Sequence, residues 1–392
     1  MIMLEQENQP LRIALLGASG SIGEQTLAVI AAHPDAFRLQ AASVGSDMAA
    51  LRTIVSRFGC RAVAVADPDA ARQWPAALLG CECLAGEDAN AALCEREDVD
   101  AVVIALPGMQ AIHPLLAAIR SHKRLAVANK ECLVCGGDYV QGVLAQHGAC
   151  LYPIDSEQSA IFQCLQGLSS ADEVDRLILT ASGGPFRQHT AAQMRHMTVR
   201  DALAHPNWSM GAKISIDSAT LINKGLEVIE AHFLFGIPAE KIDVRVHPQS
   251  IVHSMVQTID GAVLAQLGEP DMRLPIQYAL TFPKRWTCPA QPPRWANWTT
   301  LTFEAPDMER FPGLALAYEA LRMGGSATAV YNAADEVAVE AFLQEKIGFL
   351  DIHRCVERAL QQHQPTALRS LEDILAADAQ ARALTREQIA KP

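Results

Sequence analysis

The first 150 residues alternate short apolar runs with helix-like stretches, and this alternation limits the possible folds more than any other feature. Strands that alternate with helices build parallel, doubly wound sheets whose strands are buried on both faces. The chain is therefore predicted to be an α/β protein with an N-terminal Rossmann-like doubly wound sheet. The predicted strands are Leu11–Leu16, Phe37–Val44, Arg61–Val65, Ala101–Leu106, Arg124–Ala128 and Cys150–Ile154.

A glycine-rich turn at residues 17–23 joins the first strand to the first helix, which is predicted to end near Ala32. Its sequence, Gly-Ala-Ser-Gly-Ser-Ile-Gly, has the spacing G-x-x-G-x-x-G, with Ser19 at the usual middle glycine. Glycines allow backbone N–H groups to approach a pyrophosphate, and the helix N-terminus adds partial positive charge. The turn therefore predicts a dinucleotide site, and the alternative is a tight turn without a ligand.

The second strand is followed by Gly45, Ser46 and Asp47. An acidic residue in this region often binds the ribose 2′-hydroxyl and favours NAD over NADP. Asp47 is therefore a candidate ribose ligand. The alternative is that Asp47 caps the helix that begins at Met48.

The pattern changes after about Pro153, where a second sheet is predicted within a central α+β region. A helix should run from Ala219 to Leu234, with Ser218 as its N-cap and Gly236 as its stop. Gly261 is expected in a hairpin turn between Thr258 and Val263. The strands predicted for this sheet are Leu177–Thr180, Lys213–Ile216, Lys241–Val246 and those within Val252–Gln266.

Residues 283–312 are rich in proline and tryptophan and are predicted to form an extended linker. Everything after Gly313 is predicted to be helical, which indicates a C-terminal helical bundle. The predicted division is 1–153, 154–282, 283–312 and 313–392. The predicted C-terminal helices are Leu314–Met323, Ser326–Glu345, Asp351–Gln361 and Ser370–Gln388.

Asp155-Ser156-Glu157 lies between a predicted strand and the next helix. Residues i and i+2 of extended backbone point the same way, so the two carboxylates can converge. Converging carboxylates repel one another unless a cation or a proton lies between them, and oxygen ligands suit Mg²⁺ or Mn²⁺. The alternative is a pair of solvated acids at the start of a helix.

The predicted helix at 219–234 carries Asn223, Lys224 and Glu227 on one face. Glu230 lies on the same side, so the periodicity leaves Glu227 and Glu230 open as possible metal ligands. A glycine inside a helix costs roughly 1 kcal/mol relative to alanine, so Gly225 indicates a close approach by another group. The alternative for this helix is an ordinary amphipathic surface stretch.

Two loops offer further polar groups. Residues 180–186, Thr-Ala-Ser-Gly-Gly-Pro-Phe, can present hydroxyl and backbone N–H donors to an anion. Residues 205–211, His-Pro-Asn-Trp-Ser-Met-Gly, combine a histidine with an exposed indole, which favours a mobile lid that excludes water. A histidine in such a loop is otherwise most often a surface residue.

Charge and composition exclude some classes of protein. The chain has 32 Lys and Arg against 44 Asp and Glu, for a formal net charge of −12, which argues against a general nucleic-acid binder. Residues 1–10 lack a secretory pattern, and the apolar runs are too short to span a bilayer. The ten cysteines, including Cys132 and Cys135 in C-x-x-C spacing, are expected to be reduced thiols in a cytoplasmic protein.

Taken together, the motifs closely resemble the 1-deoxy-D-xylulose 5-phosphate reductoisomerase family. They occur in order over nearly the whole chain, and their combination is far more specific than any one of them. They are the turn at 17–23, Ala-Asn-Lys-Glu at 128–131, Asp-Ser-Glu at 155–157, Ser-Gly-Gly-Pro-Phe at 182–186, the loop at 205–211, Ile-Asp-Ser-Ala-Thr-Leu-Ile-Asn-Lys-Gly-Leu-Glu at 216–227, His-Pro-Gln-Ser at 247–250, Gln-Leu-Gly-Glu-Pro-Asp-Met-Arg at 266–273 and Asn-Ala-Ala-Asp-Glu at 332–336.

The resemblance implies a homodimer with an NADPH-binding domain, a central catalytic domain for metal, substrate and dimerisation, and a helical C-terminal domain. It implies conversion of 1-deoxy-D-xylulose 5-phosphate, a small phosphorylated sugar, to 2-C-methyl-D-erythritol 4-phosphate in the non-mevalonate route to isoprenoid precursors. The implied chemistry is a retro-aldol cleavage and re-addition followed by hydride transfer from NADPH, with Mn²⁺, Mg²⁺ or Co²⁺ as the metal. No nucleic-acid or membrane partner is implied.

The resemblance also assigns roles to residues. Asp155, Glu157 and Glu227 are the implied metal ligands, and with Lys130 and His205 they form the implied catalytic set. The implied substrate contacts are Lys130, Ser156, Glu157, Ser182, His205, Trp208, Met210, Ser218, Asn223, Lys224 and Glu227, of which Ser182, Ser218, Asn223 and Lys224 hold the phosphate end. The candidate cofactor contacts are Ser19, Gly20, Ser21, Ile22, Gly45, Ser46, Asp47, Asn129, Glu131 and Gly211.

A few positions depart from the usual pattern of the family. Gln158 stands where a histidine is common, and Cys132 replaces a common serine. Ser46 and Asp47 lack the cationic residue that some members place near the 2′-phosphate, which bears on the preference for NADPH. The alternatives are a dehydrogenase with another substrate, which would not need three convergent carboxylates, and an inactive homologue, which would be expected to have lost one of the catalytic residues.

Overall fold

The computed structural model describes residues 9–72, 74, 80–205, 207–208 and 210–391. The chain forms two compact units, each built from separate stretches of sequence. Unit 1 comprises Met1–Asn129, Val143–Asp155 and Asp271–Gln291, and unit 2 comprises Lys130–Gly142, Ser156–Pro270 and Pro292–Pro392. The predicted division into three domains and a linker remains a prediction.

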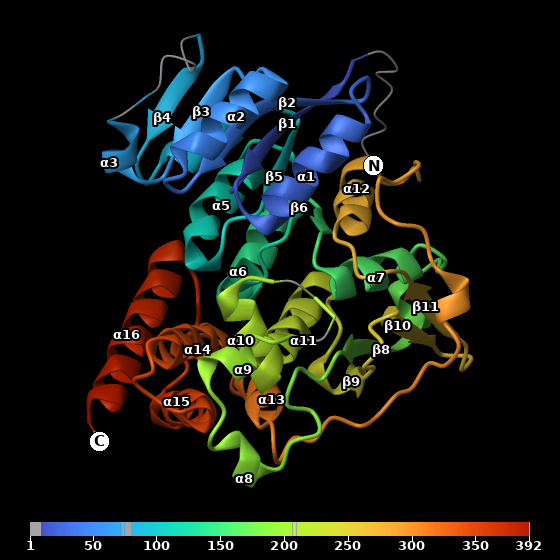
Figure 1. The fold of residues 1–392 in the computed structure, drawn as a ribbon, viewed down its shortest axis with the longest axis vertical. Coiled ribbons are helices and arrows are strands. Elements are labelled where there is room, and N and C mark those ends of the chain that lie inside the picture. The colour runs from blue at the N-terminus through green and yellow to red at the C-terminus, as the bar shows by residue number, and fades with distance from the viewer. Residues whose placement is uncertain (1–8, 73, 75–79, 206, 209, 392) are drawn as a thin grey trace. The chain divides into compact units, whose positions relative to one another are not determined.

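Unit 1 contains a parallel seven-stranded sheet in the order β4-β3-β2-β1-β5-β6-β7 (Figure 1). The strand order reverses direction between β1 and β5, as in doubly wound folds that bind ligands beyond the carboxyl ends of their strands. Its strands are β1 Leu11–Leu16, β2 Phe37–Val44, β3 Ala62–Val65, β4 Glu82–Ala85, β5 Ala101–Ile104, β6 Arg124–Val127 and β7 Leu151–Pro153.

The predicted N-terminal strands are confirmed, and β1 and β2 have the predicted bounds. The chain also has a strand that was not predicted from the sequence, β4, whose residues are mostly exposed. A strand at the edge of a sheet lacks the continuous apolar run that identifies buried strands, so its sequence gives little signal. The prediction of a Rossmann-like doubly wound sheet is therefore correct.

Helices cover both faces of this sheet (Figure 1). Helix α1 packs against α12, and α4 packs against α5. The apolar core of unit 1 includes Ile13, Leu15 and Val103 from the sheet and Ile276 and Leu280 from α12. The helices of this unit are α1 Ser21–Ala32, α2 Met48–Phe58, α3 Pro68–Ala71, α4 Ala89–Cys94, the 3-10 turn η2 Gly108–Ala111, α5 Ile112–Arg120 and α12 Arg273–Thr281.

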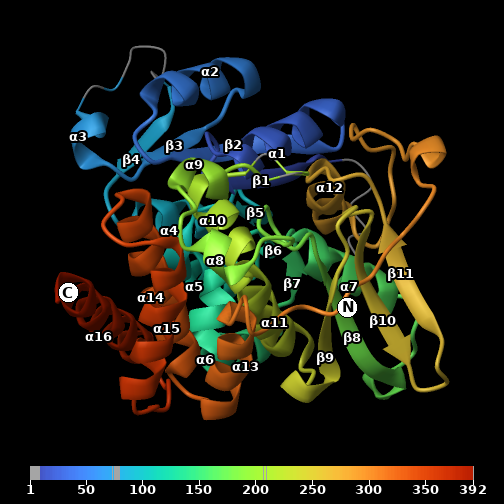
Figure 2. The same ribbon diagram turned by 60° about the horizontal axis from the view of Figure 1, so that its bottom comes forward.

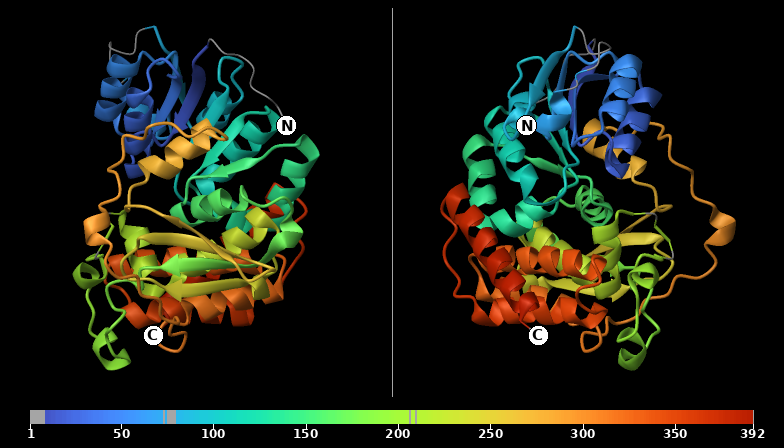
Figure 3. Two further views of the ribbon diagram at one scale, coloured as in Figure 1. Left: turned by 90° about the vertical axis from the view of Figure 1, so that its right-hand side faces the viewer. Right: turned by 60° about the vertical axis from the view of Figure 1, so that its left-hand side comes forward.

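Unit 2 is built on a mixed four-stranded sheet in the order β11-β10-β8-β9 (Figure 3). Strands β8 and β9 are parallel, and β10 pairs antiparallel with both β8 and β11. The predicted hairpin turn is confirmed, since Gly261 has φ +88° between the last two strands. The strands are β8 Val174–Ala181, β9 Ile242–Val246, β10 Val252–Thr258 and β11 Val263–Leu267.

The predicted strand at 213–216 is wrong, because these residues belong to helix α10, Ala212–Thr220. Lys213 and Asp217 form an i, i+4 ion pair there, and four alternating residues were too few to distinguish strand from helix. The helix predicted from Ala219 is instead two helices that meet at Leu221, and the second is α11, Ile222–Phe235. Ser218 is therefore inside α10 and is not an N-cap.

Gly236 ends α11 in a left-handed conformation, as predicted. The remaining helices before the linker belong to unit 2, except that α6, which is kinked at Gly137, continues from unit 2 into unit 1. They are α6 Glu131–His147, α7 Ser156–Leu165, η3 Ala171–Glu173, α8 Ala191–Met194, α9 Val199–Ala202 and η4 Ala239–Lys241.

The segment 283–312 contains only a short 3-10 turn, η5 Trp295–Asn297, and a single β-bridge from Glu304 to Val246. The C-terminal helices follow as predicted, and α14 packs against both α15 and α16 (Figure 2). They are α13 Gly313–Met323, α14 Ala327–Leu343, α15 Phe349–Gln362 and α16 Leu371–Ala390. Within the described part of the chain, no helix is both long and apolar enough to cross a membrane.

Gly225 provides a test of the packing of α11 on the C-terminal helices. A Cβ atom at Gly225 would lie 2.8 Å from Cβ of Ala317 and closer still to Oη of Tyr331, whereas at Gly142, also in a helix, it would meet nothing within 4 Å. Gly225→Ala should lower the free energy of unfolding by about 1–3 kcal/mol, and Gly142→Ala should raise it by up to about 1 kcal/mol. Urea denaturation measures both, and a stabilising Gly225→Ala would contradict this packing.

Candidate active site

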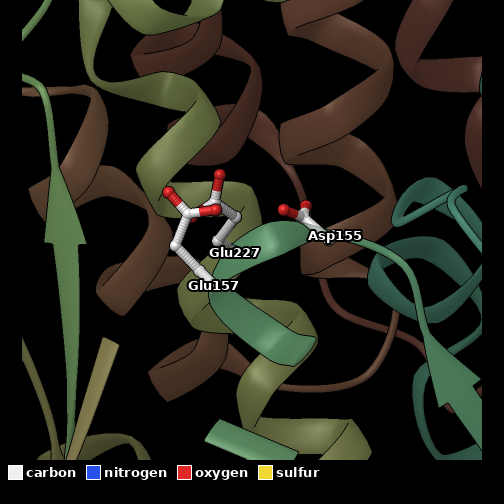
Figure 4. A group of neighbouring side chains, drawn as sticks. All are labelled: Asp155, Glu157 and Glu227. Carbon is white, nitrogen blue, oxygen red and sulfur yellow. The ribbon is translucent and has the colours of Figure 1, made fainter. Parts of the chain in front are cut away.

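Three acidic residues, one after β7, one in α7 and one within α11, converge on one point. Asp155 follows β7, Glu157 lies in the first turn of α7, and Glu227 is buried in α11. Their carboxylates turn towards one another (Figure 4), and one oxygen from each lies within 4.8 Å of the others. Among the described residues this group contains Glu227 and not Glu230, the two residues that periodicity alone could not separate.

The donor set suits a hard divalent cation. Mg²⁺ and Mn²⁺ prefer oxygen ligands, and octahedral bonds of about 2.1 Å place ligand oxygens about 3–4 Å apart. The observed spacing of the three oxygens, within 4.8 Å, needs only a small contraction to reach that range. Three carboxylates also leave coordination positions open for substrate oxygens or water.

Two buried lysines offset the negative charge of this group. Nζ of Lys224 lies 2.9 Å from Glu157 and also pairs with Glu227, while Nζ of Lys130 lies 3.1 Å from Glu227. Burial lowers the pKa of Lys224, but the two ion pairs outweigh burial and the net pKa is raised, so its ammonium stays charged. The site therefore combines converging carboxylates with fixed positive charge.

Amide side chains hold Glu227 in place. Asn223, one turn earlier in α11, donates to its carboxylate and also accepts a hydrogen bond of 2.9 Å from Lys130. Gln158 is fully buried in α7 and donates to the backbone oxygen of Glu227 at 2.8 Å. The shared face predicted for Asn223, Lys224 and Glu227 is confirmed. The hydrogen bond from Gln158 to the Glu227 backbone was not predicted. The sequence shows only that residue 158 is a glutamine where a histidine is common in the family.

The small-residue loop after β8 meets the histidine loop. Oγ of Ser182 lies 2.9 Å from Nε2 of His205 and accepts a hydrogen bond from the Gly184 amide at 3.2 Å. Gly184 has φ +68°, and a Cβ there would lie 2.6 Å from the Ser218 oxygen. Ser182, His205 and Ser218, three predicted substrate contacts on separate segments, are thereby brought together.

The His205 ring is neutral in this arrangement. Its Nδ1 accepts hydrogen bonds from the backbone amides of Asn207 and Trp208, at 3.2 Å and 3.0 Å. An accepting Nδ1 carries no proton, so Nε2 bears the hydrogen and donates it to Ser182. Burial lowers the pKa of His205 in agreement with this protonation state.

The predicted lid residues lie between His205 and α10. Trp208 and Met210 are half-buried, and Gly211 is the N-cap of α10. The indole of Trp208 lies 6.2 Å from the ring of His253, a buried residue of β10 whose pKa is lowered by burial to about 4. No sequence signal had singled out His253. Pro206 and Ser209 of this motif lie outside the described residues.

The dinucleotide turn has the geometry that its glycines require. Gly17 has φ +82°, and a Cβ there would lie 2.5 Å from the Ala105 oxygen. Gly20 is exposed and is the N-cap of α1, and no side chain caps the first turn of this helix. Ser19, Ser21 and Ile22 lie next to Gly20 in the chain, and the uncapped first turn of this twelve-residue helix offers backbone N–H groups to an anion.

The other candidate cofactor contacts lie in both units. Gly45 and Ser46 are exposed after β2, and the Asp47 carboxylate accepts a hydrogen bond of 2.9 Å from the Ala50 amide. The helix-capping alternative for Asp47 is thus observed. Asn129 in unit 1 donates to the Leu106 and Gly108 oxygens, both at 2.9 Å. Glu131 begins α6 in unit 2.

Family models match most of the chain. The model for 1-deoxy-D-xylulose 5-phosphate reductoisomerase matches residues 13–137, its C-terminal domain model matches 151–235, and the DXP reductoisomerase C-terminal domain model matches 267–384. The chain belongs to the 1-deoxy-D-xylulose 5-phosphate reductoisomerase family.

Similar proteins cover the chain almost completely. Family members from Geobacillus kaustophilus and Chlorobium chlorochromatii are 53% identical over 378 residues and 51% identical over 373 residues, which is 95% and 94% of this chain and 98% and 97% of theirs. The solved family structure from Zymomonas mobilis, in complex with NADPH, has a TM-score of 0.92 at 43% identity and covers 98% of this chain and 100% of that one.

A second solved structure is described as DOX-P reductoisomerase in complex with NADPH, fosmidomycin and magnesium. It has a TM-score of 0.90 at 39% identity and covers 97% of this chain and 98% of that one. The expected N-terminal Rossmann-like sheet, central α+β region and C-terminal helices of this family are therefore the fold of this chain.

Glu227→Gln tests the carboxylate group directly. Removing one charged ligand should weaken Mn²⁺ binding at least about tenfold. Glu230→Gln, one turn further along α11 and equally buried, should leave the affinity unchanged and is the matched control. Isothermal titration with Mn²⁺ measures both, and weaker binding in Glu230→Gln alone would assign the third ligand to Glu230.

The neutral His205 ring predicts a definite titration. Its folded-state pKa lies below the ordinary value of 6.5, so the neutral ring stabilises this loop above pH 6.5. The stabilisation is lost as the pH falls from 6.5 towards the folded-state pKa. Proton NMR of the histidine rings, assigned with His205→Asn, should show this pKa below 6.5. A higher value would contradict the proposed hydrogen-bond pattern.

Proposed function

We propose that Asp155, Glu157 and Glu227 bind the divalent metal with which this chain converts 1-deoxy-D-xylulose 5-phosphate to 2-C-methyl-D-erythritol 4-phosphate. The chain is an NADP-dependent reductoisomerase, and its cofactors are NADPH and a divalent metal. The observation that supports the ligand assignment is the convergence of the three carboxylates. A dehydrogenase with another substrate or an inactive homologue is not favoured.

The metal-side residues have complementary parts in this proposal. When bound, the cation supplies a Lewis acid that polarises substrate oxygens and stabilises negative charge as the carbon skeleton rearranges. Lys130, held by Asn223 and Glu227, can hold or deliver a proton at a substrate hydroxyl. Ser156, whose hydroxyl donates to Glu157, orients that carboxylate and contacts the substrate.

The phosphate end of the substrate is assigned to Ser182, Ser218, Asn223 and Lys224. Hydroxyl, amide and ammonium groups are the usual donors to phosphate oxygens. The charged Lys224 and the close approach of the Ser182 loop to Ser218 support this assignment. His205, Trp208 and Met210 would close over the bound substrate and keep water from it.

The cofactor is assigned to the turn at 17–23 and the segments near it. When bound, NADPH supplies the hydride that reduces the rearranged substrate. Its pyrophosphate is expected at the uncapped first turn of α1. The remaining proposed contacts are Ser19, Gly20, Ser21, Ile22, Gly45, Ser46, Asp47, Asn129, Glu131 and Gly211.

The proposal extends to assembly and context. We propose a homodimer, because β11 is an edge strand on which Val263 and Leu264 are exposed by 50% and 37%, and a second copy could extend the sheet there. The ten cysteines, all in the described part of the chain, form no disulfide bond, which supports a reducing, cytoplasmic location. Manganese as a working metal and a place in isoprenoid precursor synthesis complete the proposal, together with the division at 153, 282 and 312.

Steady-state oxidation of NADPH tests the catalytic assignment. With 1-deoxy-D-xylulose 5-phosphate and Mn²⁺, the wild-type chain should oxidise NADPH, and Glu157→Gln should lower kcat about a hundredfold or more. Glu240→Gln, an exposed acid in η4, should retain the wild-type rate. Full activity of Glu157→Gln would remove Glu157 from the site, and oxidation of NADH with equal efficiency would show that the chain does not prefer NADPH.

Val263→Lys tests the homodimer. A charge on the β11 edge should block strand pairing between copies, so analytical ultracentrifugation should show a monomer where the wild type is a dimer. Leu203→Lys alters another exposed apolar residue, exposed by 39%, and should leave the dimer intact. An unchanged dimer in Val263→Lys would place the interface elsewhere.

A further inference from the structure

The break between α10 and α11 has an unusual backbone. Leu221 joins the two helices in a left-handed conformation, φ 60° and ψ 9°. This region is disfavoured for residues other than glycine, asparagine and aspartate, so such a turn persists only where surrounding groups fix it. The turn separates Ser218 at the end of α10 from Asn223 and Lys224 at the start of α11, and it therefore sets the spacing between these proposed phosphate contacts.

His353 of α15 contacts this turn from the C-terminal helices. Its Nε2 lies 3.0 Å from the backbone oxygen of Thr220, the last residue of α10. A carbonyl oxygen only accepts hydrogen bonds, so Nε2 carries the proton and donates it. The ring is 4% exposed, and burial lowers its pKa to about 4, so it is neutral near pH 7. His353 thus satisfies a carbonyl that lies at a helix end, where carbonyls lack intrahelical partners.

Two more residues of the C-terminal helices converge on the same turn. Oη of Tyr331 donates to the Gly313 oxygen at 2.9 Å and lies 3.4 Å from the Ile222 oxygen. Gly313 packs so closely that a Cβ there would lie 3.0 Å from the Thr220 oxygen and 2.5 Å from Cγ1 of Ile222. The turn is therefore enclosed by α13, α14 and α15, with His353 and Tyr331 as its polar contacts from those helices.

We propose that His353 is a positioning residue for the phosphate end of the substrate. Through its hydrogen bond to the Thr220 oxygen it fixes the left-handed turn at Leu221, and the turn holds Ser218 at its distance from Asn223 and Lys224. The inference rests on the proposed assignment of these three residues to the phosphate. It gives the C-terminal helices a part in substrate recognition although none of their residues is assigned to the substrate.

A buried imidazole is unfavourable at this position unless its N–H group donates a hydrogen bond. Transfer of an unpaired polar group to the interior is unfavourable, whereas an apolar side chain would pack without that cost. The ring of Phe349 lies 6.2 Å from the ring of His353, so the surroundings are suited to an apolar side chain. The hydrogen bond to Thr220 is what an apolar residue could not supply.

The experiment compares His353→Leu, which fills the space without a donor, with His353→Gln, whose amide can donate to the same oxygen. His353→Leu should raise both KM for the sugar phosphate and the inhibition constant of inorganic phosphate by about tenfold. KM for NADPH should stay at the wild-type value, and His353→Gln should restore most of the phosphate affinity. Tyr331→Phe gives the same readout, with a smaller increase, if His353→Leu does not fold.

His363→Leu is the matched control. His363, directly after α15, bonds at 2.8 Å to the hydroxyl of Ser326, directly before α14, rather than to a residue of the turn. This variant should lose stability without a change in phosphate affinity. The inference is overturned if folded His353→Leu and Tyr331→Phe keep wild-type affinity, if His363→Leu weakens it equally, or if His353→Gln does no better than His353→Leu.

Ser218→Ala separates this inference from the function on which it rests. If Ser218→Ala weakens phosphate inhibition and the His353 and Tyr331 variants do not, the phosphate assignment stands and the positioning role fails. If Ser218→Ala has no effect on phosphate inhibition, the assignment of Ser218 is wrong and the inference fails with it. Weaker phosphate binding in both sets, with rescue by His353→Gln, supports the inference.

Discussion

The structure around the active site depends on holding like charges together. Asp155, Glu157 and Glu227 have oxygens within 4.8 Å of one another, and two carboxylates at about 4 Å repel each other by roughly 4 kcal/mol at an effective dielectric constant of 20. Lys130 and Lys224 oppose this repulsion through ion pairs with the glutamates. Both lysines are almost completely buried, so water screens their charges little. This arrangement holds the three proposed metal ligands close together without a cation between them.

Rigid supports on unit 2 maintain that arrangement. Gln158 ties α7 to the backbone of α11, and α13 and α14 pack so closely on α11 that a Cβ atom at residue 225 would clash with them. Lys213 adds a further link, because it pairs with Asp217 in α10 and with the fully buried Asp335 in α14. The C-terminal helices thus hold α10 and α11 in position. Most of the residues proposed to bind metal and phosphate lie on or beside these two helices.

Much of this could be predicted from the sequence because its signals are local. The apolar runs fixed β1 and β2, and the motif Asp155-Ser156-Glu157 placed two carboxylates close together. Long-range contacts decided the rest. Periodicity could not separate Glu227 from Glu230, nothing marked Leu221 as a left-handed break, and the alternation at Lys213–Ile216 suggested a strand where an ion pair and packing on α14 favour a helix. Gln158 and His353 act through backbone oxygens of distant residues, which no local pattern encodes.

The central claim is that these three carboxylates bind the catalytic metal, and a crystal structure of the chain soaked with Mn²⁺ tests it most directly. The account predicts an anomalous difference peak among the three carboxylates. One oxygen each of Asp155, Glu157 and Glu227 should lie about 2.1–2.2 Å from the peak. Such a structure would also show whether Lys130 and Lys224 keep their contacts once the cation is bound. A strong peak elsewhere, with no peak among the three carboxylates, would contradict the account.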